Sequence, residues 1–101
     1  ILIANAGIGG SAKQAEDLRP EDFRRVIDVN LNGAVNAVSA VLPQMIERGS
    51  GGQLVAVSSL AGFRGLPKSA AYCASKAAMT AYFESVRLDV QDKGIAVTII
   101  Q

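Results

Sequence analysis

The chain has 101 residues, half of them hydrophobic, and a formal net charge of +1. This is enough for one small domain with a buried core, and we assign residues 1–101 to a single domain. Ten basic residues are scattered among nine acidic ones, which argues against a surface for nucleic acid. The sequence contains no histidine, the commonest acid/base group and metal ligand, and we predict no metal site.

The single cysteine, Cys73, cannot form an intramolecular disulfide. This favours a reducing compartment, and we expect a cytoplasmic protein. Long uninterrupted apolar runs and the layout of a signal peptide are both missing, so we predict no membrane span.

The first predicted strand, residues 1–4, is an apolar run without alternation, which is typical of a strand buried on both faces. A long helix is predicted from Pro20 until the glycines that begin at Gly49, and acidic residues in its first turn suit the helix dipole. Asn30 and Pro43 interrupt the helical pattern, and we expect a kink near Asn30.

A second strand is predicted at residues 53–57, a second helix at about 70–92 and a third strand at 95–100. The order strand, helix, strand, helix, strand implies parallel strands joined by right-handed crossovers, in an α/β layered sheet. Since the sequence starts and stops inside apparent strands, we expect it to be a piece of a longer protein, truncated at both ends.

Two polar segments follow the first two strands: Asn5-Ala6-Gly7 and Ser58-Ser59. Ligands of parallel α/β sheets bind beyond the carboxyl ends of the strands, so these residues lie on the side where a site is expected. Each segment alone is also compatible with an ordinary turn or a strand end.

Tyr72 is followed four residues later by Lys76, a spacing that places both side chains on one face of a helix. An ordinary tyrosine, with a pKa of about 10, is a poor base at neutral pH. A fixed ammonium nearby favours the phenolate, and such a tyrosine can exchange a proton with an alcohol or a carbonyl oxygen. Ser59 could orient the same oxygen. The alternative interpretation is that Tyr72 and Lys76 form a chance pair on a solvated helix face and have no catalytic role.

Taken together, the motifs resemble those of the short-chain dehydrogenase/reductase family over essentially the whole chain. Residues 5–7 match its Asn-Ala-Gly motif, and residues 29–33 resemble its helix motif with a catalytic asparagine. Ser59 precedes Tyr72 by thirteen residues, which is the family spacing, and residues 72–76 match Tyr-x-x-x-Lys. The resemblance implies part of a Rossmann-like doubly wound parallel sheet, about the fourth to sixth strands of seven.

The resemblance also implies roles for these residues. Tyr72 would be the general acid/base, Lys76 would favour its phenolate and bind the nicotinamide ribose, Ser59 would polarise the substrate oxygen, and Asn30 would hold a water that links Lys76 to solvent. Asn5, Ala6 and Gly7 would line the cofactor pocket. The implied reaction is reversible hydride transfer between NAD or NADP and an alcohol/carbonyl pair.

The family's Gly-rich turn, which holds the pyrophosphate, does not occur in this sequence. Two alternatives also stay open: a non-catalytic binding module with the same fold, and a redox-neutral epimerase or dehydratase. Mostly apolar residues between Ser59 and Tyr72 favour a lipophilic small-molecule substrate. Family members pair their two long helices, which predicts a homodimer or homotetramer through small and apolar positions here: Ala34, Ala37, Val41, Ala77, Ala78, Ala81, Phe83 and Val86.

Overall fold

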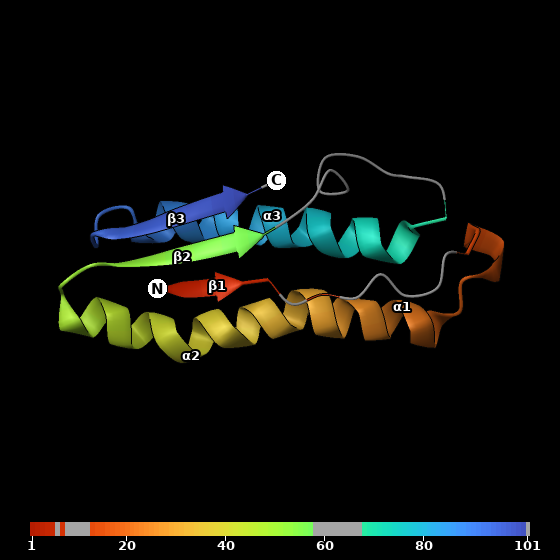
Figure 1. The fold of residues 1–101 in the computed structure, drawn as a ribbon, viewed down its shortest axis with the longest axis horizontal. Coiled ribbons are helices and arrows are strands. Elements are labelled where there is room, and N and C mark those ends of the chain that lie inside the picture. Colours follow the sequence, from red (N-terminus) through yellow and green to blue (C-terminus); the bar gives the residue numbers. More distant parts are fainter. Residues whose placement is uncertain (6, 8–12, 58–67, 101) are drawn as a thin grey trace.

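Three parallel strands form the sheet of the protein, in the order β1-β2-β3. The computed structural model describes residues 1–5, 7, 13–57 and 68–100. The strands are β1 (Leu2–Ala4), β2 (Gly52–Val57) and β3 (Ile95–Ile100). The three arrows in Figure 1 point the same way, so the carboxyl ends of the strands lie at one end of the sheet. The α/β class predicted from the alternation of elements is confirmed, as part of a Rossmann-like sheet.

One continuous helical segment connects β1 to β2, after a short 3₁₀ helix η1 (Ala15–Asp17). It consists of α1 (Pro20–Ile27), the π-helical turn η2 (Asp28–Asn32) and α2 (Gly33–Arg48). Pro20 occupies the start of α1, where its missing N–H costs nothing. Gly49 ends α2 in the left-handed conformation with a φ of 67°, and its N–H donates to the Ile46 carbonyl. The predicted ends of this helix are therefore confirmed.

The helix changes form at Asn30, where the sequence predicts a kink. In η2 the N–H of Gly33 donates to the carbonyl of Asp28, five residues earlier. Such π-helical turns insert one extra residue into an α-helix and occur frequently at functional sites. Pro43 lies inside α2 without ending it. Pro43 has no N–H to donate to the carbonyl of Ser39, four residues earlier. Both residues are exposed, so water can solvate that carbonyl.

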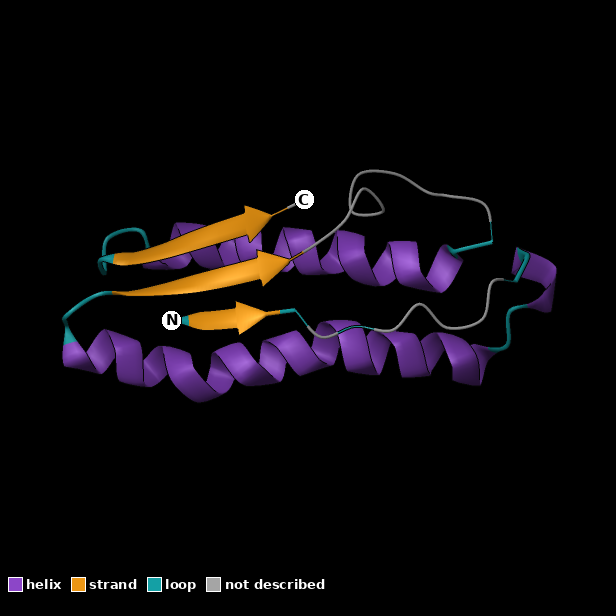
Figure 2. Ribbon diagram, in the orientation of Figure 1, coloured by secondary structure: helices purple, strands orange, loops and turns teal. Residues whose placement is uncertain are grey.

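The core lies between the sheet and the two long helices, α2 and α3 (Ala70–Val90), which run alongside the strands in Figure 2. Leu54 and Ala56 of β2 are fully buried in the same cluster as Val38 of α2 and Phe83 of α3. Both helices thus cover one face of the sheet. The expectation that the first strand is buried on both faces is wrong for this chain, because Ile3 on the opposite face is 61% exposed.

Two other predictions from the sequence bear on these helices: the absence of a membrane span stays a prediction, and part of the oligomer interface needs correction. Residues Pro20–Arg48 form one helix that is long and apolar enough to cross a membrane by length and composition. The core helix of a water-soluble protein meets the same criterion, and Val38 of this helix belongs to the core. Three residues assigned to an oligomer interface, Ala34, Phe83 and Val86, are instead buried inside the chain and cannot contact a second copy.

Candidate active site

Helix α3 carries Tyr72 and Lys76 in its first two turns. The Lys76 ammonium lies over the Tyr72 ring, with Nζ 5.8 Å from the ring centroid. Tyr72 is half-buried, whereas Lys76 is only 5% exposed. The spacing of four residues therefore brings a cation and an aromatic ring together, as the sequence predicts.

The buried Lys76 ammonium has a backbone carbonyl as a hydrogen-bond partner. Its Nζ donates to the carbonyl of Val57, at the carboxyl end of β2, over 3.4 Å. Among the described residues, no carboxylate forms an ion pair with it. Because burying an unpaired charge is costly, the dipole of the Val57 carbonyl contributes to the stabilisation of this ammonium.

Asn30 is brought to the same place by the π-helical turn. Its side chain is 1% exposed, and its Nδ2 donates to the hydroxyl of Ser75 over 3.0 Å. Ser75 is fully buried, and its own hydroxyl donates to the carbonyl of Tyr72 over 2.8 Å. Side-chain hydrogen bonds thus connect η2 to the first turns of α3.

Gly7, just beyond the end of β1, completes this arrangement. A Cβ at Gly7 would lie 3.1 Å from Asn30 Oδ1 and 3.3 Å from Lys76 Nζ. The bare backbone of Gly7 therefore makes room for both polar atoms, which border the same small space. Residues from three elements far apart in the sequence meet at the carboxyl ends of β1 and β2, where ligands of parallel sheets bind.

The other predicted site residues lie near this cluster or outside the described part of the chain. Asn5, directly after β1, is exposed. Ala6 and Ser59 lie outside the described residues. The structure therefore brings together Gly7, Asn30, Tyr72 and Lys76, and the roles given to them stay predictions.

Comparison with known proteins decides the family. A model of the short chain dehydrogenase family matches residues 1–101, the whole chain. The chain belongs to the short-chain dehydrogenase family.

Individual relatives agree with this assignment. An uncharacterized oxidoreductase of Myxococcus xanthus is 52% identical over 100 residues, which is 99% of this chain and 39% of that protein. A 3beta-hydroxysteroid dehydrogenase of Mediterraneibacter gnavus is 41% identical over 99% of this chain and 36% of its own length. The crystal structure of an NAD⁺-bound xylitol dehydrogenase matches with a TM-score of 0.92 and 38% identity, covering 97% of this chain and 37% of that one. The chain thus spans less than two fifths of the length of each of these three proteins.

Ser75 is the residue of the cluster that the sequence analysis missed. The signal was present: a serine three residues after Tyr72 in a helix can donate back to its carbonyl. Full burial of that serine and its contact with Asn30 depend on the packing of η2 against α3.

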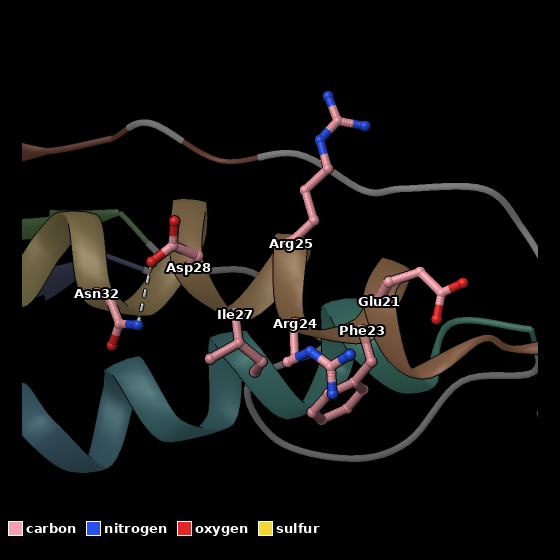
Figure 3. A pocket seen from close by; sticks show the side chains of 7 residues that line it. All are labelled: Glu21, Phe23, Arg24, Arg25, Ile27, Asp28 and Asn32. Carbon is pink, nitrogen blue, oxygen red and sulfur yellow. Dashed lines mark hydrogen bonds between the residues drawn. The ribbon is translucent and has the colours of Figure 1, made fainter.

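A separate cavity of about 550 Å³ lies along α1 and η2, and Figure 3 shows the side chains that line it. Phe23 and Arg24 extend from one side of the helix and Arg25 from the opposite side, while Asn32 donates to Asp28 over 3.3 Å. Tyr72, Lys76 and Asn30 do not line this cavity. The candidate site is therefore the polar cluster at the strand ends.

Proposed function

We propose that the protein containing this chain is an NAD(P)-dependent oxidoreductase that interconverts an alcohol and a carbonyl compound. The observation that carries the proposal is the buried Lys76 ammonium, 5.8 Å from the Tyr72 ring at the carboxyl ends of parallel strands. Membership of the short-chain dehydrogenase family supports it independently.

Tyr72 acts as the general acid/base of this reaction. In reduction, the phenol gives its proton to the carbonyl oxygen; in oxidation, the phenolate takes the proton of the alcohol. The Lys76 ammonium, 5.8 Å from the Tyr72 ring centroid, stabilises the negative charge that develops on the phenol oxygen when its proton leaves. Ser59 orients the reacting oxygen by a hydrogen bond. Asn30 holds the water through which Lys76 exchanges protons with solvent.

The residues at the end of β1 fit a nicotinamide cofactor. Asn5 and Gly7 are exposed there, and the bare Gly7 backbone lies beside the Lys76 ammonium, a donor suited to ribose hydroxyls. We propose that residues 5–7 line the cofactor pocket and that Lys76 binds the ribose. When bound, NAD(P)H supplies the hydride that reduces the carbonyl carbon, and NAD(P)⁺ accepts it in the reverse direction.

We propose a lipophilic alcohol or ketone as the substrate. The segment between Ser59 and Tyr72 includes Phe63, Leu66 and Pro67, and its composition is mostly apolar. A wall of this kind stabilises an uncharged substrate by burying apolar surface.

The test is NAD(P)H absorbance with the purified full-length protein and a panel of lipophilic ketones and alcohols. We expect turnover by the wild type, loss of at least about 100-fold in kcat for Tyr72→Phe, and little change for Tyr82→Phe on the same helix. Product formation without net change in NAD(P)H would favour an epimerase or dehydratase. Cofactor binding without any chemistry would favour a binding module.

We also propose a cytoplasmic homodimer or homotetramer. The exposed side of α3 carries Ala77, Ala81 and Leu88, the last 66% exposed, and small residues allow close approach of a second helix. The buried thiol of Cys73 is free and agrees with a reducing compartment. Light scattering of the full-length protein tests the assembly, and a monomer would contradict it.

A further inference from the structure

We propose that Ser75 is a positioning residue that fixes the orientation of the Asn30 amide, so that the amide oxygen and not the NH₂ group borders the Lys76 ammonium. The proposal rests on the proposed function, because it assigns Ser75 a part in setting the electrostatics of Lys76.

The first step concerns the single proton of the Ser75 hydroxyl. A serine hydroxyl has one hydrogen to donate, and that of Ser75 goes to the Tyr72 carbonyl, 2.8 Å away. Its oxygen can then only accept a further hydrogen bond. The group that Asn30 presents to it must therefore be the donor, Nδ2, at 3.0 Å.

The second step concerns the other end of the amide. When Nδ2 points to Ser75, the other polar atom of the amide, Oδ1, points away from Ser75. There it lies 3.1 Å from the place that a Gly7 Cβ would occupy, and Lys76 Nζ lies 3.3 Å from the same place. The negative end of the amide dipole therefore faces the same small space as the buried ammonium, and it attracts that positive charge.

A flipped amide would reverse this interaction. The NH₂ group would then border the ammonium, and Oδ1 would meet a hydroxyl whose proton is already committed to Tyr72. Both contacts would be unfavourable in a site where Asn30 is 1% exposed and Ser75 fully buried. Ser75 thus acts on Lys76 through Asn30 without touching the reacting atoms.

The kinetic test is a double-mutant cycle in the full-length protein, with Ser75→Ala, Asn30→Ala and the double variant. We expect Ser75→Ala to lower kcat roughly 10-fold in the wild-type background and to have little further effect in the Asn30→Ala background. Thr80→Ala is the matched control, because Thr80 donates to the Lys76 carbonyl one turn further along α3. An equal loss from Ser75→Ala in both backgrounds would overturn the proposal, since it would show that Ser75 affects kcat independently of Asn30.

A second measurement does not depend on activity. In side-chain amide NMR spectra, the Asn30 NH₂ protons of the wild type should show contacts to the Ser75 β protons and slow exchange with water. We expect exchange to be at least about tenfold faster in Ser75→Ala and unchanged in Thr80→Ala. Unchanged Asn30 exchange in Ser75→Ala would overturn the proposal. If the wild type fails to turn over NAD(P)H, the proposed function fails, whereas this spectrum still decides whether Ser75 orients Asn30.

Discussion

Replacing Gly7 by alanine should impair catalysis far more than it impairs folding. The added methyl would lie 3.1 Å from Asn30 Oδ1 and 3.3 Å from Lys76 Nζ. Both distances are shorter than ordinary van der Waals contact of a Cβ, which begins at 3.4 Å, so a neighbour must move by a few tenths of an ångström. Asn30 is buried and bonded to Ser75, whereas the ammonium is the end of a flexible side chain. Asn30 must yield slightly to the closer contact, and the Lys76 ammonium moves away from its own position.

The size of the effect follows from the contact that Lys76 then loses. Its hydrogen bond to the Val57 carbonyl already measures 3.4 Å, near the outer limit for such bonds. Losing a hydrogen bond to a charged group costs about 1.5–3 kcal/mol. If this loss falls on the transition state, kcat should drop by roughly 10- to 100-fold.

The assay compares steady-state kinetics and thermal unfolding of Gly7→Ala with those of Gly33→Ala. Gly33 is the matched control, because its nearest neighbour, the Asp28 carbonyl oxygen, would lie at an ordinary 3.9 Å from the new Cβ. Gly33→Ala should keep the wild-type kcat. A Gly7→Ala variant with kcat within about twofold of the wild type would refute the reasoning.

Three further predictions concern stability, titration and cofactor binding. In urea unfolding, Gly49→Ala should lower the free energy of unfolding by about 1–2 kcal/mol, because Gly49 has a left-handed φ of 67°. No atom of the described residues lies within 4 Å of the new Cβ, so backbone strain is the whole effect. Gly51→Ala should lower the free energy of unfolding further, because φ is 84° and the new Cβ would also lie 3.0 Å from the Gly94 carbonyl oxygen. Equal losses of stability for the two variants would be inconsistent with this. Burial raises the pKa of Tyr82, so the free energy of unfolding should fall as pH rises above about 10. The Tyr82→Phe variant should lose less stability over the same pH range. Parallel curves of unfolding free energy against pH for the two proteins would contradict this. The 101-residue chain by itself should show no tight NAD(P)H binding in calorimetry, because its sequence lacks the Gly-rich phosphate-binding turn; submicromolar affinity would disprove this.

The elements of the fold were predictable because their signals are local. Pro20 marks the start of the long helix and Gly49 its end through backbone preferences that act within one turn. The same holds for the pair Tyr72 and Lys76, since a spacing of four residues alone places two side chains on one helix face.

Other features depend on packing between distant segments and could not be predicted. Which face of the sheet is buried depends on where both helices lie, and Ile3 is exposed because α2 and α3 cover the opposite face. Phe83 fits the apolar pattern of an interface as well as that of a core, and only its full burial distinguishes them. The contact between Asn30 and Ser75 joins residues 45 positions apart. Sequence spacing carries no signal for such a contact.

Hydride transfer is the central claim, and isotope transfer tests it most directly. The full-length protein is incubated with NADH or NADPH deuterated at the transferring position of the nicotinamide and with a ketone substrate, and the alcohol is analysed by mass spectrometry. We predict one deuterium at the carbinol carbon for each cofactor oxidised, with a rate that falls in Tyr72→Phe without any change in the position of the label. Product that carries no deuterium, formed while the cofactor stays reduced, would contradict the assignment of this chain's cluster to carbonyl/alcohol oxidoreduction.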